Sequence, residues 1–400
     1  MRKNHVSVLL VFSMIGLHSI VNGATFKGEV EGRYYYYGED SLFREQSDHK
    51  NQYALAATLD YNGQINRNID INVSVFGRYH PQAHTPYQSD VRELALNYYA
   101  SQLEVSGGVL MERWGVLEAF SPVDILNPRD RVEDFQGDIK RGIPGGRLSW
   151  LLDDGRIDAW LLPYSREERL AEGKDRFRVS EFAFSDAEFK KGQNAVSSAV
   201  RISQMLESVE FAVSYYNGHA RSPYFIPNLD GVGNVITLQP NYARIEQAGF
   251  ELLWVRGQVL VKLESIYRST NDDNFTGLGI GLEREFPRIG STKNGLTLYG
   301  EYYYDGRESD RSSPLTPFQN DIFLGFRLAL NNLSGTEYEL RLTRDLDNHS
   351  SFWDLRAKTR IKQQWFIEAS VYKFSNVDND PALQSFASDS RVAVNVMLGF

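Results

Sequence analysis

The feature of this sequence that most constrains its fold is the alternation of apolar and polar residues with a period of two. In RVAVNVMLGF, residues 391–400, Val392, Val394 and Val396 share one parity, and Asn395 lies on the other. A period of two predicts a β-strand with one apolar and one polar face. About 18 such segments follow one another along the chain. Each is close to the ~9–11 residues with which a tilted strand crosses a bilayer.

The connections between these segments alternate between short and long. NGQINRN at 62–68 is a short turn, whereas 111–144 and 164–194 are long loops. Transmembrane barrels have short periplasmic turns and long outer loops. The segment SREERLAE at 165–172 is predicted to form a turn or two of helix inside a long loop. The predicted strands are 26–37, 50–61, 68–79, 91–99, 101–110, 145–152, 155–163, 195–205, 208–217, 243–254, 257–268, 275–286, 294–304, 319–330, 335–345, 351–361, 364–374 and 390–400.

The bare alternating strand at 390–400 would leave an exposed sheet edge unless it pairs with another strand. Pairing with the first strand, 26–37, closes the sheet, and closure is what satisfies backbone groups in lipid. We therefore predict an all-β chain that forms a transmembrane, antiparallel, up-and-down β-barrel of about 18 strands, with 16 as the alternative. A secreted β-sandwich or propeller would explain the alternation, but not the alternating loop lengths.

The N-terminal residues predict export. Arg2 and Lys3 precede an apolar stretch from Val6 to Val21, and the small residues Gly23 and Ala24 follow. This is the pattern of a cleaved signal peptide over 1–24, with an uncleaved anchor as the alternative. The barrel then occupies 25–400. With a formal net charge of −9, the chain has no basic excess that would favour nucleic acid as a partner.

These features together resemble the Gram-negative outer-membrane porin superfamily. The resemblance rests on the signal peptide, the strand meander, the long third outer loop and a last strand that ends in Phe400. It implies an outer-membrane location in contact with lipid and lipopolysaccharide, and recognition of Phe400 and its strand by the barrel assembly machinery. The resemblance also implies assembly as a homotrimer, although nothing in these residues requires it. Within loop 111–144, Trp114–Gly115, Asp124 and Asn127–Pro128–x–Asp130 look like a motif of uncharacterised outer-membrane barrel families.

Loop 111–144 is the segment predicted to narrow the barrel lumen. It carries apolar residues such as Trp114 and Phe135 that favour inward packing. Mixed charges at such a constriction create a transverse field that selects solutes by charge and dipole. The alternative is an ordinary surface loop with solvated charges. The charged residues predicted at the constriction are Glu112, Arg113, Glu118, Asp124, Arg129, Asp130 and Arg131.

The polar parity of the strands predicts the residues that line the lumen wall. A basic wall that faces acidic groups would guide charged solutes through a hydrated pore. The alternative is that these charges pair across strands and brace the barrel. The basic residues are Arg327, Arg341, Arg356, Lys358 and Arg360, and the acidic ones include Glu29, Glu31, Glu251, Glu264, Glu283 and Glu301.

The function predicted from these features is passive diffusion of small hydrophilic solutes, with no cofactor, no metal site and no catalysis. Two alternatives stay open: a barrel plugged by its own loops that acts as an adhesin or structural protein, and a hydrolase at the barrel rim. The hydrolase would need a histidine with an acid or serine, but no nucleophile elbow or metal-binding spacing is present. Its candidate histidines are His49, His80, His84, His219 and His349.

Overall fold

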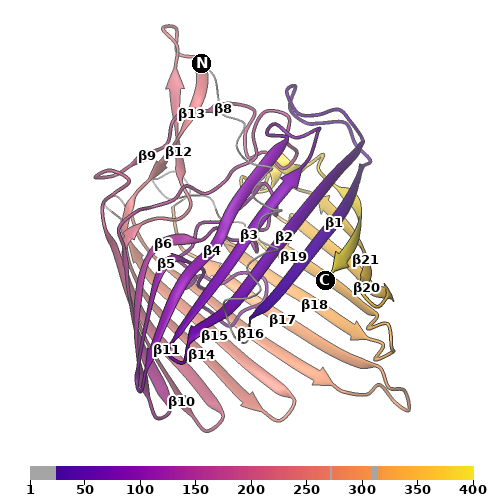
Figure 1. The fold of residues 1–400 in the computed structure, drawn as a ribbon. Helices are drawn as coiled ribbons and strands as arrows, with labels where there is room; N and C mark the ends of the chain where they lie inside the picture. Colours follow the sequence, from indigo (N-terminus) through magenta and orange to yellow (C-terminus); the bar gives the residue numbers. More distant parts are fainter. Residues whose placement is uncertain (1–23, 271–272, 309–313, 315, 317) are drawn as a thin grey trace.

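The chain folds into a closed antiparallel β-barrel (Figure 1). The structure is a computed structural model that describes residues 24–270, 273–308, 314, 316 and 318–400. The proposed signal peptide therefore lies almost wholly outside the described residues. Among the described residues, no helix is long and apolar enough to cross a membrane.

The barrel has 18 strands, and each pairs with the next along the wall. They are β1 (Thr25–Tyr37), β2 (Asn51–Asn66), β3 (Ile69–Tyr79), β4 (Tyr87–Ala100), β5 (Leu103–Leu110), β6 (Ile143–Leu152), β7 (Gly155–Leu162), β10 (Ser197–Leu206), β11 (Val209–His219), β14 (Arg244–Arg256), β15 (Val259–Ser269), β16 (Asn274–Phe286), β17 (Gly295–Asp305), β18 (Asn320–Ala329), β19 (Glu337–Asp345), β20 (Ser351–Lys362), β21 (Trp365–Ser375) and β22 (Arg391–Gly399). One short 3-10 helix, η2 (Gln384–Phe386), lies between the last two strands.

All 18 predicted segments overlap a barrel strand, so the predicted fold class is confirmed. Two local predictions are wrong. The turn predicted at 62–68 is shorter, because β2 continues to Asn66. A bulge between Gln64 and Asn66 lets Asn66 pair with Ile69 at the start of β3. Residues 165–172 form no helix, because their backbone pairs with another loop: the Arg169 N–H donates to Arg129 O at 3.0 Å, and Arg169 O accepts from the Arg131 N–H at 2.9 Å.

The barrel closes where β1 meets β22. The pairing begins at Glu29 with Gly399 and is antiparallel throughout. Two backbone hydrogen bonds extend it, from the Gly28 N–H to Phe400 O at 2.8 Å and from the Phe400 N–H to Gly28 O at 2.9 Å. Gly28 leaves room for the Phe400 ring, since a Cβ at this position would lie 2.3 Å from it. The predicted pairing of first and last strands is therefore observed.

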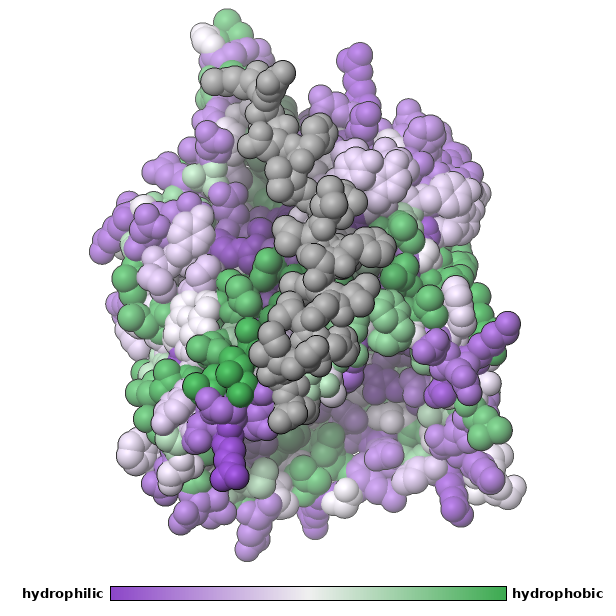
Figure 2. Space-filling model, in the orientation of Figure 1, coloured by the Kyte–Doolittle hydropathy of each residue, from purple (hydrophilic) through white to green (hydrophobic). Residues whose placement is uncertain are grey.

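The two faces of each barrel strand follow the alternation in the sequence. On β20, Trp353 and Leu355 are exposed on the outer face, whereas Phe352 and Asp354 are buried on the inner face. Outward-facing Leu94 and Leu96 on β4 keep 45% and 49% of their surface exposed, far more than a soluble core residue would. Figure 2 shows hydrophobic residues gathered around the middle of the barrel wall and hydrophilic residues towards both ends.

Four strands outside the barrel form a second, small sheet from two of the long loops. β12 (Tyr224–Leu229) and β13 (Val235–Tyr242) make a hairpin, and the two-residue strands β8 (Ala183–Phe184) and β9 (Glu188–Phe189) pair with β13 in parallel. The hairpin rises above the barrel at the end that carries the long loops (Figure 1). Sequence periodicity did not predict this sheet, because its strands are short and sit in irregular segments.

Candidate functional site

The segment between β5 and β6 folds into the barrel and crosses its lumen. We call residues 111–142 the inner loop. Trp114, at its start, packs edge-on against Trp160 of β7, with ring centroids 5.2 Å apart. Farther along, Phe120 stacks on Phe318, and Phe135 reaches the β20 side, where its ring lies 5.2 Å from that of Phe352. The inner loop therefore contacts the barrel on well-separated parts of its wall.

One side of the wall holds the inner loop by its backbone. The inner loop has no strand partner here, so its N–H groups need acceptors from elsewhere. Three inward-facing carboxylates supply them: Glu251 on β14, Glu264 on β15 and Glu301 on β17, which we call the carboxylate wall. The bonds run from Gly115 N to Glu251 (3.1 Å), from Val116 N and Leu117 N to Glu264 (2.6 and 2.9 Å), and from Glu118 N and Ala119 N to Glu301 (2.8 and 3.0 Å).

Two further features fix this contact. The Ser121 hydroxyl donates to the second oxygen of Glu264 at 2.7 Å, so among the described residues all hydrogen-bond donors to that carboxylate belong to the inner loop. Gly115 has a φ of +97°, and a Cβ there would lie 2.0 Å from Ser121 Oγ and 2.6 Å from a Glu264 oxygen. A side chain at this position would therefore both strain the backbone and push the inner loop off the wall.

The opposite side of the wall holds the inner loop by a side chain. Glu133 is buried and forms ion pairs of 2.8 Å with Arg33 of β1 and 2.8 Å with Arg78 of β3. Gln88 of β4 lies against both Glu133 and Asp130, with its Nε2 at 3.4 and 3.3 Å. Here the loop provides the carboxylate and the barrel provides the cations.

Residues of the motif noted in the sequence (Trp114–Gly115, Asp124 and Asn127–Pro128–x–Asp130) hold the two ends of the inner loop together. Asn127 accepts a hydrogen bond from the Glu112 N–H at 2.9 Å and donates to Leu110 O and Arg141 O at 3.0 and 2.9 Å. Asp124 forms an ion pair with Lys140. Burial lowers the pKa of Lys140 and the pairing opposes that shift. The motif thus holds the inner loop in place rather than forming a solute site by itself.

The seven residues predicted at the constriction all lie on the inner loop, but most of their charges are paired. Asp130 bonds to Arg169 at 2.6 Å, and burial raises its pKa in spite of that partner. Glu118 keeps 39% of its side chain exposed next to Lys262. The others are arranged as follows: Glu112 with Arg147, Asp124 with Lys140, Arg131 with Glu168, Arg129 over the Phe120 ring, and Arg113 largely exposed near Asp138 O.

The predicted basic wall is partly neutralised by cross-strand pairing. Asp354, fully buried on β20, pairs with both Arg341 and Arg356, and Arg327 pairs with Glu339 at 3.1 Å. Lys358 and Arg360 stay exposed, with Phe366 as an aromatic neighbour at 5.8 and 5.5 Å. Among the acidic residues, Glu29 is exposed, Glu31 pairs with Arg33, and Glu301 binds the inner loop.

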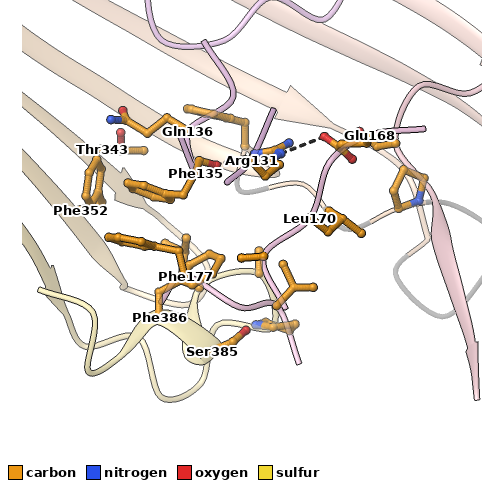
Figure 3. A pocket seen from close by; sticks show the side chains of 18 of the residues that line it. Arg131, Phe135, Gln136, Glu168, Leu170, Phe177, Thr343, Phe352, Ser385 and Phe386 are labelled. Atoms are coloured by element: carbon orange, nitrogen blue, oxygen red, sulfur yellow. Dashed lines mark hydrogen bonds and ion pairs between the residues drawn. The ribbon is translucent and has the colours of Figure 1, made fainter. Parts of the chain in front are cut away.

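A cavity of about 430 Å³ lies at the long-loop end, against the inner loop. Figure 3 shows Phe135, Phe177, Phe352 and Phe386 around it, with the ion pair between Arg131 and Glu168 at its edge. Phe135 stacks on Phe177 with ring centroids 4.7 Å apart. No sequence pattern predicted this cavity, because Phe177 and Phe386 come from long loops without any periodicity.

One of the histidines considered for a rim hydrolase, His219, has a structural role. His219 is buried, with Nδ1 2.9 Å from Ser165 Oγ and Nε2 2.8 Å from Lys190 O. Both ring nitrogens are therefore used to fix the long loop 163–196 to β11. In the part of the chain that the structure describes, no group of His, Cys, Asp and Glu side chains is arranged to hold a metal ion.

Comparison with known proteins identifies the fold. No family model and no curated protein sequence matches the chain. Among solved structures, OccK3 (OpdO) of Pseudomonas aeruginosa superposes with a TM-score of 0.54 at 10% identity, covering 97% of this chain and 98% of its own. A BenF-like porin from Pseudomonas fluorescens Pf-5 gives 0.56 at 8% identity, covering 95% and 99%. Wzi of Escherichia coli, described as a capsule-assembly outer-membrane protein and carbohydrate-binding β-barrel, gives 0.55 at 12% identity, covering 97% and 87%. The chain has the 18-stranded barrel fold found in outer-membrane porins.

Proposed function

We propose that this protein is an outer-membrane channel through which small solutes diffuse passively. The observation that carries the proposal is the inner loop, which enters a closed barrel and is anchored on two sides of its wall. A barrel of this strand number is wide enough for an aqueous lumen, and a loop held across it sets the size of the path. The exposed apolar residues on the outer face, such as Leu94 and Leu96, suit a hydrocarbon surrounding.

The charges that remain exposed give the proposed path a mixed character. Glu118 on the inner loop and Lys358 and Arg360 on β20 are the best examples. Most other predicted lumen charges are compensated by partners within 4 Å, so a weak selectivity is expected rather than a strong one. We propose hydrophilic solutes with a modest charge bias as the general cargo.

Single-channel recording tests the proposal. The refolded protein is inserted in a planar bilayer, and conductance and the reversal potential in a salt gradient are measured. Discrete, steady openings with a small reversal potential are expected. A barrel that is folded and inserted but never conducts would overturn the channel.

A second candidate, the plugged barrel, is favoured by how widely the inner loop contacts the wall. Its partners lie on β1, β3, β14, β15, β17 and β20. One structural neighbour, Wzi, is described as a carbohydrate-binding barrel. A closed barrel that acts through its outer loops would show no conductance in the wild type, and conductance only after the inner loop is released by substitutions in the carboxylate wall.

A further inference from the structure

The cavity beside the inner loop is assembled from segments that are distant in sequence. Phe135 belongs to the inner loop, Phe177 to the loop 163–196, Phe352 to the barrel wall and Phe386 to η2. The ring centroids of Phe135 and Phe386 are 5.7 Å apart, and those of Phe177 and Phe386 are 6.1 Å apart. Several long loops thus converge to build one aromatic enclosure in front of the proposed path.

The lining of the cavity is mostly apolar. Leu170 and Phe323 add to the four phenylalanines. Among the uncharged polar residues of the lining, Gln136 and Thr343 lie on one side of the phenylalanine rings and Ser385 lies on the other (Figure 3). A cavity with apolar walls and a few hydrogen-bonding groups is the usual form of a small-molecule site. A fully hydrophilic solute would lose its hydration there without gaining equivalent partners.

The charged groups around the cavity already have partners within the protein. Arg131 pairs with Glu168 at 2.9 Å and also donates to Phe135 O at 2.7 Å. Arg341 pairs with Asp354. An ionised ligand would therefore be desolvated without meeting a free counter-charge among the described lining residues.

We propose that this cavity binds neutral solutes that carry a planar apolar ring and a hydrogen-bonding edge. The ring would lie among the phenylalanine faces, which favour stacked and edge-to-face contacts. The polar edge would face Gln136 and Thr343. The cavity is then the recognition site for one class of cargo, a consequence that rests on the proposed channel function, although binding itself does not.

Three soluble glucosides test the chemistry of the site. Phenyl β-D-glucoside has the ring and is neutral, methyl β-D-glucoside lacks the ring, and phenyl β-D-glucuronide adds an ionised carboxylate. Binding to the full chain in detergent micelles is measured by isothermal titration calorimetry. Phenyl glucoside is expected to bind saturably and about tenfold or more tightly than methyl glucoside, because burial of the ring provides most of the affinity. The glucuronide is expected to bind more weakly than phenyl glucoside.

Two neighbouring substitutions on η2 locate the site. Ser385 lines the cavity, whereas Gln384 is exposed and does not. Ser385→Trp should fill the cavity and weaken phenyl glucoside at least tenfold, and Gln384→Trp should change it less than twofold. Far-ultraviolet circular dichroism establishes that both variants fold.

The inference is overturned if phenyl glucoside does not bind saturably, if methyl glucoside or the glucuronide binds as tightly, or if the two tryptophan variants bind alike. Conductance is recorded on the same preparations. If the protein conducts but fails these binding tests, only the proposed ligand site is wrong. If it passes them but never conducts, only the proposed channel function is wrong.

Discussion

The inner loop is held on two sides of the barrel by opposite arrangements of the same chemistry. On the carboxylate wall, the barrel supplies the anions and the loop supplies backbone N–H groups. On the β1–β3 side, the loop supplies the anion, Glu133, and the barrel supplies the cations, Arg33 and Arg78. Backbone groups are present whatever the loop sequence, whereas Glu133 is a single side chain. Removing a loop side chain should therefore loosen the β1–β3 side, whereas the other side depends on the glutamates of the carboxylate wall.

The largest effect is expected on the carboxylate wall. Glu264→Leu leaves the Val116 and Leu117 N–H groups without their acceptor and removes the closer of the two acceptors of the Ser121 hydroxyl, which costs about 3–5 kcal/mol of the free energy of unfolding. Urea unfolding measures this loss, and single-channel conductance should rise as the inner loop leaves the wall. Glu264→Gln keeps a carbonyl acceptor and should cost less than half as much. Equal effects of the two variants would contradict the backbone anchor.

The next effect is expected on the β1–β3 side. Glu133→Gln leaves Arg33 and Arg78 with a neutral partner in a buried site, at a cost of about 2–4 kcal/mol. The same urea titration reports it. A double variant with Glu264→Gln tests independence, since anchors on separate walls should give nearly additive losses.

The β1–β3 side should also respond to acid through His80. Burial, followed by the nearby Arg78, lowers the pKa of His80 to about 4, while Glu133 opposes the shift and Arg33 and Arg391 add to it. Because the unfolded chain takes up the proton near pH 6.5, the stability that His80 contributes is full above that pH and is lost as the pH falls through 4. Between pH 7 and 4, His80→Gln should flatten the decline in unfolding free energy by about 1–2 kcal/mol.

Urea titrations at several pH values measure this decline, and His349→Gln, at an exposed histidine, is the matched control. A decline as steep in His80→Gln as in the wild type would contradict the assignment.

The smallest effect is expected from Glu118→Gln, which repeats the chemistry of Glu133→Gln on the other side of the same loop. The Glu118 N–H still donates to Glu301, and its partly exposed carboxylate loses only an ion pair of 3.2 Å to Lys262. Such pairs contribute about 0–1 kcal/mol, so the unfolding midpoint should barely move. A loss as large as that of Glu133→Gln would remove the distinction between the two sides.

The barrel could be predicted from the sequence because its signal is local. On β20, the alternation of Trp353, Asp354 and Leu355 assigns each side chain to a face without knowledge of any distant residue. The length of the inner loop and its Trp114 and Phe135 likewise predicted an inward fold. Strand faces and the inward loop could be predicted because both depend on residues that are close together in the sequence.

The anchors and the cavity could not be predicted, because their signal is distant or absent. Glu251 and Glu301 bind loop backbone that lies 136 and 183 positions away, and a backbone N–H has no sequence signature. Parity alone placed Glu264 and Arg341 in the lumen, but it could not show that each already binds another group of the protein. Phe177 and Phe386 meet only because several loops fold over one another.

The contact between Gly28 and Phe400 belongs to the strand pairing that is expected to form last when the barrel folds. Every other pairing in the barrel joins strands that follow each other along the chain, and these can form as soon as both are present. The β1–β22 pairing spans almost the whole described chain, so it is the slowest to find by search. Until then the free side of β1 is an open edge with unpaired backbone groups, which invites pairing with other chains. The first strand must therefore be kept covered from the moment it is made until the last one arrives.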